Sequence, residues 1–318
     1  MANEMTIRVG VSTCLLGAEV RYNGGHARNA YVVETLADHF ELVPVCPEEE
    51  VGMGTPRETV NLQGDAEAPF MIAPKSGEDW TGRMNRYSAK RCRELAVEEL
   101  RGYVFKSKSP SCGVWRVKLY KGKGPAGRTT RGLFAAEFVK RFPLVPVEEE
   151  GRLRDAGLRE NFLERVFAYD RLCRLFDGRW KRGDVVAFHS REKYFLLAHS
   201  PKHYKELGRL VARIADHKPA EFRDAYLRLY MEGLGRKATV RRHVNVLQHI
   251  AGHLRGHVEP GELSQVHTVI QDYGRMLTPL VVPITLLAHL IGRHEVPYVD
   301  EQVYLHPHPK ELMLRNHV

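Results

Sequence analysis

Short apolar runs alternate with longer amphipathic segments along the first half of the chain. The apolar runs predict strands at residues 7–12, 41–45, 103–106, 113–120 and 144–147. The segments between them predict helices at residues 31–40, 80–101 and 133–142. Strands that are separated by helix-length segments are typical of a parallel sheet with helices on its faces. We therefore expect the first half to form an α/β, Rossmann-like domain.

The pattern changes from about Leu158 onward, where apolar residues recur at spacings of three and four. Phe162, Val166, Tyr169 and Leu172 follow this spacing, which indicates the apolar face of a helix. Prolines suited to the first turn of a helix mark several further starts. The additional predicted helices are residues 204–215, 219–233, 239–257, 262–277 and 280–292. We expect the second half to be all-α.

The two predicted domains, residues 1–157 and 158–318, meet near residues 151–158 and differ in charge. Residues 1–157 contain 23 Lys and Arg against 21 Asp and Glu, an excess of +2. Residues 158–318 contain 25 against 18, an excess of +7, together with 14 of the 16 histidines. A basic domain favours a polyanionic partner, although many intracellular proteins are mildly basic without binding nucleic acid.

The composition is that of a globular protein, with 43% apolar and 27% charged residues. No run approaches the roughly 20 apolar residues that span a membrane. The first residues lack the basic segment and apolar core of a signal peptide. We expect a cytoplasmic protein without a membrane partner.

Five cysteines are an odd number for a disulfide framework, and the cytosol keeps thiols reduced. Cys14, Cys46 and Cys112 each follow a predicted strand, and ligand sites collect at the carboxyl ends of parallel strands. Three thiolates that meet there can hold three irons of a 4Fe-4S cluster and leave the fourth iron open. Zinc binding and simple packing remain alternatives. Cys92 and Cys173 fall within predicted helices and are expected to be core or incidental residues.

Several motifs occur together in the first half: residues 12–17 with 21–24, residues 46–48 with 55–57, and residues 106–113. In this combination, residues 5–150 resemble the thiouracil desulfidase (TudS) family. The second half, with the segments 280–287 and 304–309, resembles the YbgA-like domain. Fusions of these two domains are similar to RNA 4-thiouridine desulfidases.

The resemblance implies that the three cysteines hold a 4Fe-4S cluster and that Glu48 and Ser109 are catalytic. Lys106, Lys108 and Arg57 are candidate substrate contacts. A plainer interpretation exists for Glu48, Ser109 and Arg57. Glu48 begins a run of three glutamates, which is typical of a solvated surface, and Ser109 lies beside a proline that shapes turns. Arg57 can instead anchor its own loop.

The predicted helix at residues 239–257 carries one apolar stripe and a basic face. Arg241 and Arg242 lie off the stripe and are our candidates for contact with RNA phosphates. His249, His253 and His257 have a spacing that can bind a metal ion, but such a row is more often solvated or touches RNA.

These observations predict an enzyme that hydrolyses 4-thiouridine in tRNA to uridine with release of sulfide. A close alternative is a desulfidase for free thiouracil bases or nucleosides. A third is a non-catalytic iron–sulfur protein that binds RNA. The reaction replaces C=S by C=O without net redox change, so no flavin or nicotinamide is implied.

Overall fold

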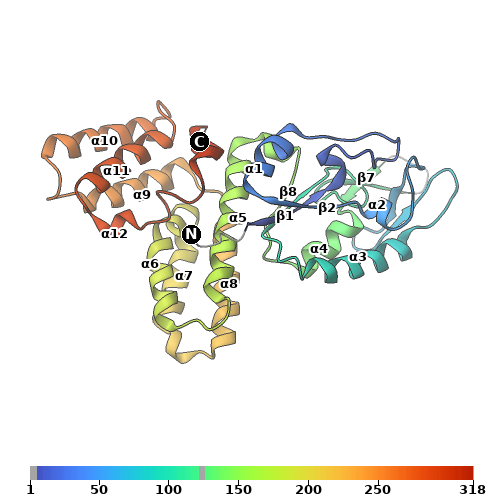
Figure 1. Ribbon diagram of the computed structural model, residues 1–318, viewed down its shortest axis with the longest axis horizontal. Coiled ribbons are helices and arrows are strands. Elements are labelled where there is room, and N and C mark those ends of the chain that lie inside the picture. Colours follow the sequence, from blue (N-terminus) through green and yellow to red (C-terminus); the bar gives the residue numbers. More distant parts are fainter. Residues whose placement is uncertain (1–5, 122–125, 318) are drawn as a thin grey trace. The chain divides into compact units, whose positions relative to one another are not determined.

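The computed structural model describes residues 6–121 and 126–317 (Figure 1). The chain divides into two compact units, Met1–Arg154 and Asp155–Val318. This division lies three residues before the boundary that we placed between residues 157 and 158. Each unit has its own core, and each is described separately below.

A four-stranded parallel sheet organises the first unit, which confirms the expected α/β class. Its strands are ordered β2 (Glu41–Val45), β1 (Arg8–Ser12), β5 (Gly102–Phe105) and β8 (Val147–Glu149). All three neighbouring pairs are parallel. The last strand begins where the predicted strand 144–147 ends. The reason is that Pro146 has no N–H to donate, so only its carbonyl joins the sheet, by accepting from the Tyr103 N–H.

The predicted strand at residues 113–120 is only partly correct. The observed strand begins at Val117, and it belongs to a second, mixed sheet. That sheet is ordered β4 (Pro69–Ile72), β3 (Asn61–Gly64), β6 (Val117–Tyr120) and β7 (Ala126–Thr130). The other three strands were not predicted, since all are short and β3 and β7 consist mainly of Gly and polar residues. Leu62, Met71, Val117 and Leu119 form its buried face.

The first unit also contains helices. They are η1 (Thr13–Leu16), η2 (Tyr31–Leu36), α1 (Ala37–His39), α2 (Pro47–Glu50), α3 (Thr81–Leu95), α4 (Leu133–Arg141) and η3 (Arg152–Arg154). Helix α3 ends six residues before the predicted end at residue 101. Tyr103 and Phe105 of β5 stack at 3.9 Å between ring centroids and pack against Phe134 and Phe138 of α4. Gly10 is required opposite them, because a Cβ there would lie 2.2 Å from the Tyr103 ring.

The second unit is helical, as expected. Its helices are α5 (Ala156–Phe176), α6 (Arg182–His199), α7 (Pro201–Ala212), η4 (Ile214–Asp216), α8 (Pro219–Leu234), α9 (Val240–His253), α10 (Pro260–Gly274), α11 (Val281–Arg293), α12 (Pro297–Asp300), η5 (Lys310–Leu312) and η6 (Leu314–Asn316). Helix α6 was missed by the sequence analysis. It packs against α5, α7, α8 and α9, so its apolar residues surround the helix and form no single stripe.

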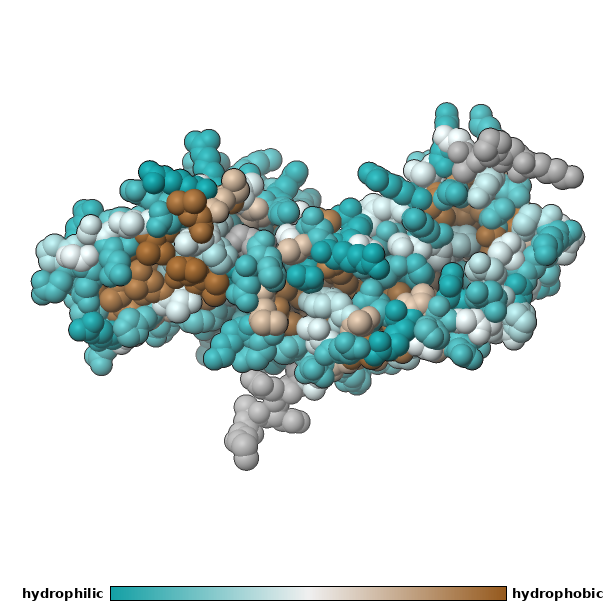
Figure 2. Space-filling model, turned by 90° about the horizontal axis from the view of Figure 1, so that it is seen from above, coloured by the Kyte–Doolittle hydropathy of each residue, from teal (hydrophilic) through white to brown (hydrophobic). Residues whose placement is uncertain are grey.

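Hydrophilic side chains cover most of the face shown in Figure 2, with hydrophobic side chains in separate patches. In the helical unit, Met276 and Leu277 are exposed between α10 and α11. None of the described helices is both long and apolar enough to cross a membrane.

Candidate functional site

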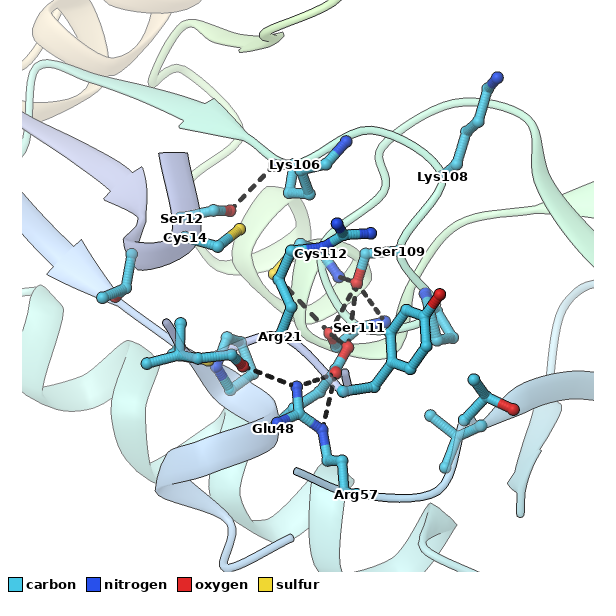
Figure 3. Close-up of a pocket in the computed structure, with 18 of the residues that line it drawn as sticks. Ser12, Cys14, Arg21, Glu48, Arg57, Lys106, Lys108, Ser109, Ser111 and Cys112 are labelled. Atoms are coloured by element: carbon cyan, nitrogen blue, oxygen red, sulfur yellow. Dashed lines mark hydrogen bonds and ion pairs between the residues drawn. The ribbon is translucent and has the colours of Figure 1, made fainter. Parts of the chain in front are cut away.

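A cavity of about 380 Å³ opens at the carboxyl ends of β1, β2 and β5 (Figure 3). Adjacent parallel strands leave their carboxyl ends at one edge of the sheet, which is why residues far apart in sequence meet there. The site residues predicted for this domain all line the cavity, and they are Cys14, Cys46, Glu48, Arg57, Lys106, Lys108, Ser109 and Cys112. Their shared location is a structural finding, and their individual roles remain predictions.

The three cysteines enter the cavity from three different segments. Cys14 lies in η1, Cys46 precedes α2, and Cys112 lies in the loop between β5 and β6. Burial raises the pKa of all three thiols, that of Cys14 to about 11, and the Glu48 carboxylate adds to the effect. Protonated thiols are poor nucleophiles, whereas a bound cationic centre stabilises thiolates. This donor set therefore suits a thiophilic metal group better than nucleophilic catalysis by cysteine.

The three thiols do not form the ligand set of a single ion. Over residues 6–121 and 126–317, no group of three or more His, Cys, Asp and Glu side chains is arranged to hold one metal ion. An iron–sulfur cluster requires thiolates that are farther apart than the ligands of one ion, because each thiolate binds a different iron. Three thiols that line one cavity from three separate segments fit a cluster.

Cys92 lies away from this site, in the core on helix α3, where its side chain is 1% exposed. Cys173 lies on helix α5 of the other unit. Neither lines the cavity.

Glu48 points into the cavity because α2 turns its three glutamates in different directions. Glu50 instead accepts the Cys46 N–H at 2.9 Å, and Glu49 faces solvent. The Glu48 carboxylate accepts hydrogen bonds from Ser109 Oγ at 3.1 Å and from Ser111 Oγ at 2.6 Å. The glutamate run is therefore not a solvated surface at this position.

Arg57 holds the other Glu48 oxygen, at 3.2 Å from Nε and 2.5 Å from Nη2. Its remaining N–H groups donate to Gly54 O, Thr55 Oγ1 and Val20 O. The guanidinium has five donors, and all are used within the protein. Arg57 therefore fixes the Glu48 carboxylate and ties it to Val20 and to its own loop, and its role as a substrate contact stays a prediction.

The loop from residue 107 to residue 113 aligns two serines with Glu48. Ser109 Oγ accepts the N–H groups of Ser111 and Cys112 and lies 2.9 Å from Ser111 Oγ. Gly132 allows this loop to fold closely, since a Cβ there would lie 2.5 Å from the Ser111 carbonyl oxygen. Ser111 was not among the predicted site residues, yet it makes the shorter of the two serine contacts to Glu48.

The two candidate lysines differ. Lys106 donates to Glu150 Oε1 at 2.6 Å and to the Ser107 carbonyl and hydroxyl. Burial alone would raise the pKa of Glu150, but the bonds from Lys106 and Ser107 outweigh it and hold the pKa below its ordinary value. Lys108 is exposed and points away from the other labelled residues in Figure 3. Lys106 thus has a structural partner, whereas the Lys108 ammonium group has no hydrogen bond or ion pair with the residues that the structure describes.

Arg21 was not among the predicted site residues, yet its side chain extends into the cavity (Figure 3). Within the described part of the chain, its guanidinium has no hydrogen bond or salt bridge and lies 5.5 Å from the centroid of the Tyr22 ring. Tyr22 also lines the cavity and is 42% exposed. The motif that contains Arg21 was visible in the sequence, but only the structure separates this uncommitted arginine from Arg57.

Helix α9 of the second unit carries the predicted RNA contacts. Arg241 is exposed, whereas Arg242 Nη1 donates to the His199 carbonyl at 2.7 Å and holds the start of the helix. Within the histidine row, His253 Nε2 lies 2.9 Å from the Tyr194 hydroxyl. His249 and His257 are exposed. No metal-ligand group exists there among the described residues.

Comparisons with known proteins match the two units separately. Residues 9–150 match the family model described as 2-thiouracil desulfurase, and residues 193–309 match one described as a protein of unknown function, DUF1722. The uncharacterized protein YbgA of Escherichia coli is 31% identical over 158 residues, which cover 49% of this chain and 94% of YbgA. The uncharacterized protein YbbK of Bacillus subtilis is 35% identical over 108 residues, which cover 32% of this chain and 71% of YbbK.

A solved structure described as the [4Fe-4S]-dependent thiouracil desulfidase TudS matches with 27% identity and a TM-score of 0.40. The match covers 48% of this chain and 97% of that chain. On the family models and the YbgA and YbbK matches, the chain belongs to the 2-thiouracil desulfurase family through residues 9–150 and to the DUF1722 family through residues 193–309.

Proposed function

We propose that the first unit replaces the sulfur of a thiolated pyrimidine by oxygen, and that its substrate is 4-thiouridine in tRNA. The observation that carries the proposal is one cavity that brings together three thiols, Glu48 and two serine hydroxyls. The family description, 2-thiouracil desulfurase, supports the same chemistry.

Cys14, Cys46 and Cys112 would hold a 4Fe-4S cluster. When bound there, the cluster supplies a thiophilic iron with an open position, which acts as a Lewis acid toward the thiocarbonyl sulfur.

Glu48 is the group that takes the proton. Water adds to the carbon of the C=S bond, and Glu48 accepts one proton from that water. The C–S bond then breaks, the remaining hydroxyl proton leaves with the sulfur, and HS⁻ is released while C=O is left. Arg57 and the serines keep the carboxylate aimed at the cavity, which is the geometry that general base catalysis needs. Oxidation states do not change, because water provides the oxygen and sulfur leaves as sulfide.

Arg21 is the proposed contact for the pyrimidine's oxygen. Its guanidinium is uncommitted, and hydrogen bonds from a charged donor are worth about 1.5–3 kcal/mol. Replacing Arg21 by Met is therefore expected to lower kcat/KM for 4-thiouridine by about 10–100-fold, with iron content unchanged. Steady-state kinetics with metal analysis measures this.

Arg28 provides the control for Arg21, since it lies on the same loop but pairs with Glu34 at the surface. Arg28→Met is expected to keep normal kinetics. If Arg21→Met turns over substrate at the normal kcat/KM, Arg21 does not contact the pyrimidine.

The second unit is proposed to bind the tRNA. Residues 158–318 carry an excess of +7, from 25 Lys and Arg against 18 Asp and Glu. Contacts between cationic side chains and phosphates give an affinity that falls steeply with salt. Arg241 is the better probe, because removing Arg242 would also remove the bond to the His199 carbonyl.

The test compares two substrates with anaerobically purified protein. Mass analysis of nucleosides is expected to show loss of 4-thiouridine from tRNA and gain of uridine, with sulfide released. Arg241→Gln is expected to slow the tRNA reaction by about three- to tenfold and to leave the free nucleoside reaction unchanged. Equal loss on both substrates would indicate damage to the cavity instead.

A second candidate is desulfidation of the free thiouracil base, which the family description favours. Rapid turnover of free thiopyrimidines together with untouched 4-thiouridine in tRNA would establish this alternative. A protein that keeps its cluster and releases no sulfide from any thiopyrimidine would instead be a non-catalytic iron–sulfur protein.

A further inference from the structure

A second cavity, of about 320 Å³, lies beside the cavity that contains the three thiols, and we call it the side pocket. The residues that line both cavities are Val60, Asn61, Lys108 and Pro110. Pro110 stands between Ser109 and Ser111 in the chain, so the two cavities meet at the loop that carries these serines. The residues that line the side pocket but not its neighbour are Leu62, Arg116, Val117, Lys118 and Tyr120.

The side pocket is cationic. Lys108, Arg116 and Lys118 are all exposed, and no carboxylate of a described residue lines the pocket with them. None of these three side chains has a hydrogen bond or ion pair with a residue that the structure describes. Cations that face one cavity without a carboxylate attract anions to it. The side pocket therefore suits a ligand that carries more than one negative charge.

Two of these cations lie on backbone that disfavours any residue other than glycine. The φ angle is 61° at Lys108 and 57° at Arg116, in the left-handed region. Among the described residues of the first unit, the other non-glycine residue with a positive φ is Glu99, and its carboxylate pairs with Arg101. Lys108 and Arg116 have no such pair. Residues in this conformation collect at functional sites, so a ligand explains these two side chains better than stability does.

Strand β6 supplies further side chains of the side pocket by alternation along the strand. Val117 and Leu119 belong to the buried face of the mixed sheet, so Lys118 and Tyr120 point to the opposite face. Tyr120 is half-buried and lines the same pocket as the cations. Cations beside an aromatic ring are typical of sites for single-stranded nucleic acid, in which the cations meet phosphates and the ring stacks on a base.

We propose that the side pocket binds the phosphate groups that flank the thiolated nucleotide in an RNA strand. The inference rests on the proposed function, because it places the thiolated pyrimidine in the neighbouring cavity. The ribose of that nucleotide then lies toward the side pocket, and the phosphates joined to the ribose meet Lys108, Arg116 and Lys118 (Figure 3 shows Lys108). The first unit thereby distinguishes a nucleotide within a strand from a free base.

The test compares substrates of increasing phosphate content, with the full-length, anaerobically purified protein. The substrates are 4-thiouridine as the nucleoside, as its 5′- and 3′-monophosphates, and as the central residue of a trinucleotide. The trinucleotide is expected to have a kcat/KM about tenfold above that of the nucleoside, because each exposed pair of opposite charges contributes up to about fivefold. Each monophosphate is expected to fall between the two.

Two variants assign this difference to the side pocket. Lys118→Met is expected to lower kcat/KM for the trinucleotide by about two- to fivefold and to leave the nucleoside unchanged. Arg116→Gly is expected to act in the same direction without lowering the unfolding temperature, since glycine suits a φ of 57°. Lys90→Met is the control, because it makes the same change at an exposed position of α3 outside both cavities, and it is expected to behave as native protein.

A binding measurement separates this inference from the proposed function, because it needs no turnover. Fluorescence anisotropy with a labelled oligouridylate gives the affinity at several salt concentrations. The slope of log affinity against log salt is expected to fall by about 0.7 in Lys118→Met relative to native protein, which is the loss of one phosphate contact on a single strand. If no thiopyrimidine releases sulfide, the proposed function fails, and this slope still tests the side pocket.

Four results would overturn the inference. The first is equal kcat/KM for the nucleoside and the trinucleotide in native protein. The second is a monophosphate that matches the trinucleotide, which would indicate a site for a single nucleotide. The third is a Lys118→Met protein that matches Lys90→Met in both kinetics and salt slope. The fourth is tighter binding of oligoglutamate than of oligouridylate, with loss in Lys118→Met, which would indicate an acidic protein partner.

Discussion

Replacing Cys14, Cys46 or Cys112 by Ala is expected to remove both the cluster and all desulfidase activity. Each thiol lines the same cavity, and each would ligate a different iron, so the loss of one leaves an iron without a protein ligand. Anaerobically reconstituted native protein is expected to be brown and to contain about four irons per chain. Iron and sulfide analysis with absorption spectra measures the result for each variant.

Cys92 and Cys173 provide matched controls, because they are the other two cysteines of the chain and lie outside the cavity. Cys92→Ala leaves a small void in the core and is expected to lower the free energy of unfolding by about 1 kcal/mol, with a normal cluster. Full activity of the native protein with stoichiometric zinc and no iron would refute the cluster assignment.

Replacing Glu48 by Gln is expected to leave the cluster in place and to lower kcat by about 10²–10⁴-fold. The amide has nearly the same shape but cannot accept a proton from water. The substitution also removes the charge that Arg57 binds at 2.5 Å, so part of the loss of kcat comes from a side chain that is held less firmly in position. Single-turnover measurements with 4-thiouridine, together with iron analysis, measure the effect.

Glu49→Gln is the control for Glu48, since it makes the same chemical change one residue away on an exposed position of α2. It is expected to keep normal turnover. If Glu48→Gln retains a near-normal kcat, Glu48 is not the base, and the Ser109 and Ser111 hydroxyls become the groups to test next.

Local sequence was enough to predict the central strands of the parallel sheet in the first unit. The strands β1, β2 and β5 are visible as short apolar runs, and each of the three cysteines follows one of them. Because parallel strands end at one edge of a sheet, convergence of the cysteines follows from the order of the elements. The second sheet was not predictable in the same way, since its short strands gain their stability from pairing with segments far away in the chain. The same holds for α6, whose neighbours surround it.

The sequence by itself determined the class of both units, the cysteines at the strand ends and the basic character of the second half. Only the tertiary structure decided how the polar side chains are used. Glu48 meets serines 61 and 63 residues away, and Lys106 meets Glu150 across 44 residues. Arg57 and Arg21 are the same residue type in the same cavity, yet Arg57 uses all its donors and the Arg21 guanidinium uses none of its donors on residues that the structure describes. Hydrogen bonds depend on distances of a few tenths of an ångström between groups that the chain separates, and a linear pattern carries no such distances.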